Sequence, residues 1–234
     1  MSGQEAGSPT RPTLLLVHGA WHGAWVWEKV QRELTARGWL VHTLDLPSVA
    51  ERGQPRKALY DDAEAVRQRV EEIKGPVVVV AHSYGGAVVT QGVTNLPNVR
   101  HIVYVCAFAL DVGESLLGLV GTQPDWWIID GDIMIPDDPR AVFYHDVEPQ
   151  EAQWAIGNLR PISYVSVTQT LTAAAWRDVA STYIICDRDV AMGAGQDVLA
   201  KRATHIRHLP SSHSPMLSMP TELTDLIVEA SNQP

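Results

Sequence analysis

The sequence is poor in cysteine and in basic residues. It has two cysteines, Cys106 and Cys186, and both lie in apolar, strand-like segments. We expect them to be buried free thiols, which argues against a disulfide framework and favours a reducing, cytoplasmic compartment. Lysine and arginine total 18 against 27 acidic residues, so the net charge is -9, and no local basic cluster stands out. This balance disfavours nucleic acid or an anionic membrane surface as the main partner.

Targeting, membrane-spanning and cofactor motifs are also missing. Residues 1–12 are polar and lack the apolar core of a signal peptide, so we expect a flexible N-terminus. No apolar run is long enough to cross a bilayer. The chain has neither G-x-G-x-x-G nor a P-loop. His18 and His22 have the spacing of metal ligands, but no carboxylate or cysteine accompanies them, so we expect no metal and no other cofactor.

The chain does show a regular alternation of apolar strand-like and amphipathic helical segments. Strands are predicted at residues 13–17, 39–44, 77–80, 99–106, 182–186 and 204–209. Helices are predicted from Trp27 to Gly38, at 58–74, from Tyr84 onward, at 193–202 and at 220–230. This alternation indicates a single α/β domain over residues 1–234, with a mostly parallel sheet of about six strands and helices on both faces.

One long segment, about residues 111–175, breaks the alternation. It holds short helical patches, several prolines and the large side chains of Trp126, Trp127, Trp154 and Tyr164. A segment of this length with its own apolar residues is too long for a connecting loop. We therefore predict an inserted helical cap.

Ser83 occupies the turn between the most apolar strand, residues 77–80, and the helix that follows it. A sharp strand-to-helix turn presents a serine hydroxyl at the carboxyl edge of a sheet, and it needs small residues two positions before and after the serine. Ala81 and Gly85 meet this need, giving A-x-S-x-G in place of the commoner G-x-S-x-G. The pattern predicts a nucleophile. The alternative is a serine that caps the helix N-terminus.

A serine nucleophile needs a base, and the base needs an acid. His213 lies in a loop after the last strand, which opens on the same sheet edge as Ser83. Asp187 and Asp189 both follow the strand at 182–186 and reach that edge as well. The order serine, aspartate, histidine is the one expected for this topology, and the strand positions leave both aspartates as candidates for the acid.

An oxyanion formed during acyl transfer needs two preorganised N–H donors. Tyr84 follows the nucleophile and can supply one from its backbone. The loop at His18-Gly19-Ala20 follows the first strand and can supply the other, from Ala20. The alternative is that this loop is only a structural turn.

Four motifs together resemble the α/β-hydrolase superfamily. They are HGAWHGAWVW at 18–27, AHSYGG at 81–86, CDRDVAM at 186–192 and SSHSPML at 211–217. Within the superfamily, the chain is similar to the group of plant methylesterases and hydroxynitrile lyases and their bacterial esterase relatives. The resemblance implies a serine nucleophile at Ser83, its base at His213 and the acid at Asp189, since Asp189 matches the family's C-x-x-D pattern.

The same resemblance implies oxyanion donors at Ala20 and Tyr84 and a cap over the pocket. The lyases of this group carry Thr where this chain has Gly19, and Lys where it has Ser214. Those side chains handle the cyanohydrin hydroxyl and cyanide, so their absence favours a hydrolase.

We therefore expect ester hydrolysis through an acyl-enzyme. Four aromatic residues and a glycine of the oxyanion loop are expected to shape an apolar pocket for a small to medium, apolar or aromatic ester: Trp126, Trp127, Trp154, Tyr164 and Gly19. The alternatives left open are lyase or C–C bond hydrolase chemistry on the same triad, a perhydrolase side activity, and a ligand-binding protein without catalysis. The expected partner is the small-molecule ester, with a homodimer left open.

Overall fold

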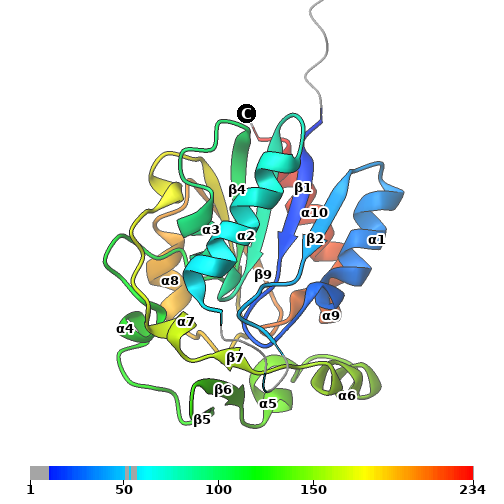
Figure 1. Cartoon of the computed structure of the whole chain (residues 1–234). Helices are drawn as coiled ribbons and strands as arrows, with labels where there is room; N and C mark the ends of the chain where they lie inside the picture. Colours follow the sequence, from blue (N-terminus) through cyan, green and yellow to red (C-terminus); the bar gives the residue numbers. More distant parts are fainter. Residues whose placement is uncertain (1–10, 51–52, 54–56, 234) are drawn as a thin grey trace, which may run out of the picture.

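The computed structural model describes residues 11–50, 53 and 57–233 of the chain. At its centre is a six-stranded sheet in the order β2-β1-β3-β4-β8-β9, and every pairing between neighbours is parallel (Figure 1). The strands are β1 (Thr13–Val17), β2 (Val41–Leu44), β3 (Val77–His82), β4 (Val99–Val105), β8 (Ser181–Cys186) and β9 (His205–Leu209). This arrangement confirms the predicted fold class.

Burial follows position in the sheet. All residues of β1 and β3 are buried, because each strand has neighbours on both edges and helices over both faces. The edge strands β2 and β9 are largely half-buried or exposed. A residue at the carboxyl end of β3 is therefore attached to a strand that is buried along its whole length.

The helices outside the insertion lie around the central sheet. They are α1 (Glu28–Ala36), α2 (Leu59–Glu72), α3 (Gly85–Gly92), α8 (Gly195–Ala200), α9 (Pro215–Ser218) and α10 (Pro220–Ser231). Helix α2 packs on α3 and α1 packs on α10, and the two pairs cover opposite faces of the sheet (Figure 1). Short 3-10 turns precede α1 (η1, Ala24–Trp27) and β8 (η2, Ala175–Arg177). Gly38 ends α1 with φ +79°, which is why glycine stands there.

The segment between β4 and β8 lies beyond the carboxyl ends of the parallel strands (Figure 1). It contains α4 (Leu116–Val120), β5 (Trp127–Asp130), β6 (Ile133–Pro136), α5 (Pro139–Phe143), α6 (Pro149–Gly157), β7 (Ile162–Ser163) and α7 (Val165–Thr168). The insertion contains helices, as a helical cap would, but the prediction missed its strands, because β5, β6 and β7 form an antiparallel sheet. Gly131, at φ +64°, makes the tight turn between β5 and β6.

Element ends differ in small ways from the predicted ones. Strand β2 begins at Val41, and Trp39 is buried in the turn before it, with the Arg11 guanidinium 4.5 Å from its ring centre. Arg11 is thus anchored, while residues 1–10 of the predicted flexible terminus lie outside the described residues.

The four-residue helix α9 was not predicted. Among the described residues, no helix combines the length and apolarity that a bilayer crossing requires.

Candidate active site

Ser83 lies in the turn between β3 and α3 with φ +52°. Few residues other than glycine adopt this conformation, because it costs free energy. The Ser83 carbonyl holds the turn by accepting hydrogen bonds from the N–H groups of Gly86 at 2.9 Å and Phe108 at 3.0 Å. A Cβ on Gly85 would lie 2.5 Å from the carbonyl oxygen of His18, so only glycine fits at this predicted small position.

The predicted nucleophile, base and acid lie in hydrogen-bond contact. Ser83 Oγ is 3.0 Å from Nε2 of His213, and Nδ1 of His213 is 2.8 Å from Oδ2 of Asp189. All three residues are buried. With the Nδ1 proton donated to the carboxylate, Nε2 is free to accept the serine proton. The three side chains can therefore work as a nucleophile with its general base.

The structure separates the two candidate acids. Asp189 Oδ1 accepts hydrogen bonds from the N–H groups of Ala191 at 2.7 Å and Met192 at 3.2 Å, which hold its other oxygen toward His213. Asp187 instead pairs with His208 at 2.7 Å, and both of these side chains are exposed. Asp189 is thus the carboxylate placed to orient the base.

The two predicted oxyanion donors belong to residues that border the same space. Ala20 and Tyr84 both line the cavity above Ser83. Within the described part of the chain, neither N–H donates to a protein acceptor. Free donors beside a nucleophile are what an oxyanion hole requires.

Two buried histidines hold the loop that carries Ala20. Nε2 of His18 accepts the Leu46 N–H at 2.9 Å, so its Nδ1–H donates to the Gly19 carbonyl at 2.8 Å. Nδ1 of His22 donates to the Ala20 carbonyl at 2.7 Å. Burial lowers the pKa of His18 to about 4 and that of His22 to about 3, so both are neutral at pH 7. All four ring nitrogens of the two histidines therefore have hydrogen-bond partners in the protein.

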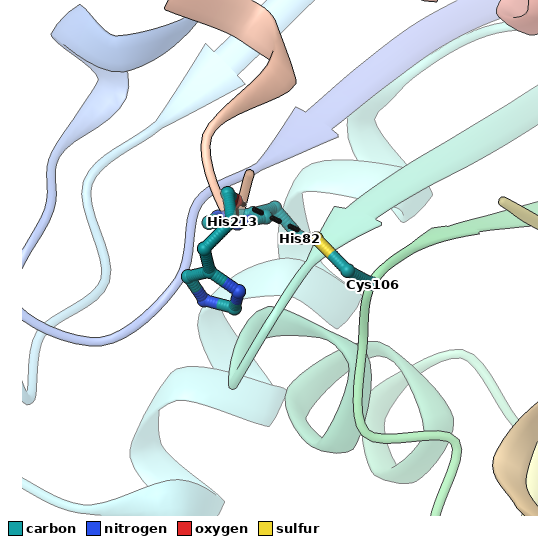
Figure 2. Close-up of side chains that lie close together, drawn as sticks. All are labelled: His82, Cys106 and His213. Carbon is teal, nitrogen blue, oxygen red and sulfur yellow. Dashed lines mark hydrogen bonds between the residues drawn. The ribbon is translucent and has the colours of Figure 1, made fainter. Parts of the chain in front are cut away.

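The side chains of His82, Cys106 and His213 lie close together (Figure 2). His82 Nε2 lies 2.8 Å from the His213 carbonyl oxygen and Cys106 Sγ lies 3.5 Å from it. Burial keeps the pKa of His82 well below its usual range, so it is a neutral donor. The ring nitrogens of His213 are taken by Ser83 and Asp189, and so the cluster holds the main chain of the base rather than presenting three free ligands.

One short part of the insertion, residues 143–146, contacts both catalytic loops. We call it the clasp. The Tyr144 hydroxyl donates to His22 Nε2 at 2.7 Å, and Asp146 accepts from the N–H of Ser212 at 2.7 Å and from its hydroxyl. The Phe143 ring lies 5.6 Å from that of His213. The clasp thus ties the insertion to the oxyanion loop and to the loop of the base.

The cavity above Ser83 has an almost wholly apolar lining. Its walls are Ala20, Trp21, Tyr84, Phe108, Leu116, Val120, Pro124, Trp126, Trp127, Phe143, Val167, Ala191 and Met192, with Ser83 and His213 at the base. A second hollow shares six of these residues and extends the site past Leu119 and Thr122 to Gly195. Among the residues that the structure describes, no aspartate, glutamate, lysine or arginine lines either hollow, so the site suits an uncharged, apolar molecule.

Three predicted pocket residues lie elsewhere. Trp154 is 46% exposed and packs edge-on against Trp25, with ring centres 5.1 Å apart. Tyr164 begins α7 and packs against the core without lining the cavity. Gly19 lies beneath the cavity, because a Cβ there would lie 2.8 Å from Ser83 Cβ. Trp126 and Trp127 line the cavity.

Sequence reasoning missed several wall residues, among them Trp21, Phe108 and Phe143. Trp21 follows the predicted oxyanion donor directly, and Phe108 follows the strand next to β3, so both were within reach of the argument that found Ser83. No local pattern marks Phe143, which reaches the cavity through the packing of the insertion.

A serine–histidine–aspartate arrangement at the carboxyl edge of a parallel sheet defines a hydrolase of the α/β type. The family model described as "Alpha/beta hydrolase family" matches residues 14–226, and the chain belongs to this family.

Among characterised proteins, the chain is 28% identical to the alpha/beta hydrolase nvfD of Aspergillus novofumigatus, over 95% of this chain and 98% of the relative. It is also 28% identical to methylesterase 7 of Arabidopsis thaliana, over 94% of this chain and 96% of the relative. The crystal structure of polyneuridine aldehyde esterase superposes with a TM-score of 0.82 at 20% identity, over 95% of this chain and 100% of that one. The alignments with nvfD and with methylesterase 7 both span nearly the whole chain.

Proposed function

We propose that this α/β hydrolase is a carboxylic ester hydrolase that cleaves uncharged esters of small to medium size, with apolar or aromatic groups, through an acyl-enzyme. The hydrogen-bonded contact from Ser83 through His213 to Asp189, at the base of an apolar cavity, carries the proposal. Similarity to a methylesterase over most of both chains supports the ester as the reacting group.

In this proposal, each residue of the site has one step of the reaction. Ser83 Oγ attacks the ester carbonyl while His213 Nε2 takes its proton, and Asp189 stabilises the resulting imidazolium. The N–H groups of Ala20 and Tyr84 stabilise the oxyanion. His213 then gives the proton to the departing alcohol and activates the water that releases the acid.

Lyase chemistry is less well supported. The lyases of this group carry Thr in place of Gly19, and a Cβ at this position would lie 2.8 Å from Ser83 Cβ and 3.0 Å from His82 Nδ1. The loop would have to move before it could hold a threonine.

Cys106 and Cys186, both buried and free, support the expected reducing, cytoplasmic location.

Covalent labelling with a fluorophosphonate probe, followed by an ester panel, tests the assignment. Wild type should be labelled, and it should hydrolyse neutral aromatic or alkyl esters faster than esters that carry a charge. The Ser83→Ala variant should not be labelled and should lose kcat on the order of 10⁶-fold, as in other triads. A wild type that resists the probe, or a Ser83→Ala variant that still reacts, would show that Ser83 is not the nucleophile. Resistance of the wild type to the probe would favour a non-catalytic ligand-binding protein.

A further inference from the structure

Asp62 is a buried carboxylate that the proposed chemistry does not use. It lies in the first turn of α2 and is fully buried. No lysine, arginine or histidine of the described residues pairs with it, and burial raises its pKa to about 6. A carboxylate buried without a cation is normally less stabilising than an apolar side chain of similar size. Packing alone therefore does not account for an aspartate here.

The hydrogen bonds of Asp62 lead to the active site. Its Oδ2 accepts from the Tyr84 hydroxyl at 2.7 Å and from the Ser48 hydroxyl at 2.5 Å. Its Oδ1 accepts from the Ser48 N–H at 2.8 Å. The Ser48 carbonyl in turn accepts from the N–H of Ser163 in β7 at 3.2 Å. A continuous series of hydrogen bonds therefore runs from the insertion to the side chain of Tyr84.

Two features of Tyr84 bear on how the oxyanion would be stabilised. Its backbone N–H is one of the two free donors above Ser83, and its residue forms the N-cap of α3. The Tyr84 side chain is 1% exposed, and its hydroxyl donates a hydrogen bond to Asp62. An N–H donor is effective only while its direction is held before the reaction begins. Anchoring the far end of the ring restricts rotation of the residue that carries this donor.

We propose that Asp62 is a positioning residue for the oxyanion hole, which holds the backbone N–H of Tyr84 through the Tyr84 hydroxyl. This inference rests on the proposed function of the Ser83 site. Asp62 touches neither the substrate nor the reacting atoms, so its effect should appear in the transition state more than in substrate binding.

Steady-state kinetics of Tyr84→Phe and Asp62→Asn test the inference. Each change should lower kcat about tenfold and change KM by less than about twofold, since a displaced donor weakens only transition-state binding. The effects of the two changes should be less than additive in the double variant, because both alter the hydrogen bond between Tyr84 and Asp62.

A trifluoromethyl ketone supplies a second readout. Ser83 Oγ adds to its carbonyl carbon, the serine proton passes to His213, and the carbonyl oxygen becomes an oxyanion in the hole. Its affinity should fall by the same factor as kcat in both variants. The affinity for the product alcohol, which forms no oxyanion, should stay at the wild-type value.

Two neighbouring positions give matched controls. Tyr60→Phe removes the hydroxyl of a half-exposed tyrosine, which donates to the Thr170 carbonyl. Asp61→Asn alters the carboxylate next to Asp62, which accepts a hydrogen bond from the Ala58 N–H. Both should keep wild-type kcat and ketone affinity.

The inference is wrong if Tyr84→Phe and Asp62→Asn keep wild-type kcat and ketone affinity, even with a lower unfolding temperature, because the network would then be structural only. Equal losses in ketone and alcohol affinity would also contradict it. If Asp62→Asn does not fold, Tyr84→Phe and Ser48→Ala decide the question alone. Failure of the proposed function is distinguishable, because wild type itself would then show no turnover and no labelling.

Discussion

Asp187 and Asp189 are identical in chemistry and two positions apart, and their surroundings give them different roles. Asp189 is buried, accepts two backbone N–H groups and faces His213. Asp187 is 45% exposed in its side chain and pairs with His208 at the surface. An exposed pair of this kind contributes little to stability or to catalysis.

Substituting each aspartate with asparagine tests this difference. Asp189→Asn should lower kcat about 10⁴-fold, because the amide no longer fixes the tautomer of His213 and no longer stabilises its charged form. Asp187→Asn is the matched control and should keep kcat within about twofold of wild type, since it alters only an exposed pair. Equal losses in the two variants, or a larger loss in Asp187→Asn, would reverse the assignment.

At this scale, the sequence predicted which residues lie close together where strand ends determine their positions, although the strand ends alone left Asp187 and Asp189 as alternatives. Ser83, His213 and the aspartate follow strand ends, and in a parallel sheet all such ends meet at one edge. The same reasoning failed for Trp154 and Tyr164, whose positions depend on how the insertion folds on itself. Their apolar character was visible, but the direction in which their side chains pack was not.

At the scale of elements, the parallel strands were predictable because continuous apolar runs of this length suit a strand buried on both faces. The antiparallel strands of the insertion were missed. Asp130-Gly131 between two apolar stretches is a hairpin signal, and it was overlooked because the insertion was treated as helical. The contacts of the clasp, residues 143–146, join segments far apart in the chain and have no sequence signature.

The clasp gives a prediction about the base. Asp146→Ala removes the acceptor of the Ser212 N–H and hydroxyl, and Ser212 directly precedes His213. The loop of the base should become less well held, and kcat should fall about tenfold. Asp137→Ala, an exposed carboxylate in the same insertion, is the control and should keep wild-type kcat. Stopped-flow measurement of acyl-enzyme formation gives the rate of the step that needs the base.

Unfolding temperatures separate this effect from simple destabilisation. The prediction holds if Asp146→Ala remains folded at the assay temperature and still forms the acyl-enzyme slowly. An unchanged rate of acylation in a folded variant would mean that the clasp does not position His213.

At the scale of the whole molecule, buried titratable groups determine how stability depends on pH. His18 and His22 have an ordinary pKa of 6.5, which burial lowers to about 4 and about 3 in the folded chain. Between pH 6.5 and these values the unfolded chain binds more protons than the folded one, so the free energy of unfolding falls as the pH falls. Asp62 acts in the opposite direction, because burial raises its pKa from 3.8 to about 6 and the folded chain binds its proton first.

The two histidines should outweigh the aspartate. From the pKa values, each histidine removes about 2 kcal/mol of stability between pH 7 and pH 5, while protonation of Asp62 returns about 1 kcal/mol. Urea unfolding at pH 7, 6 and 5 should therefore show a net loss of about 3 kcal/mol from these three groups, and a larger total loss because burial also lowers the pKa values of His82 and His101. His22→Gln keeps a donor for the Ala20 carbonyl and an acceptor for the Tyr144 hydroxyl but does not titrate, so it should reduce the loss by about 2 kcal/mol. Stability that is constant or rises from pH 7 to pH 5 would mean that these histidines are not held neutral by burial.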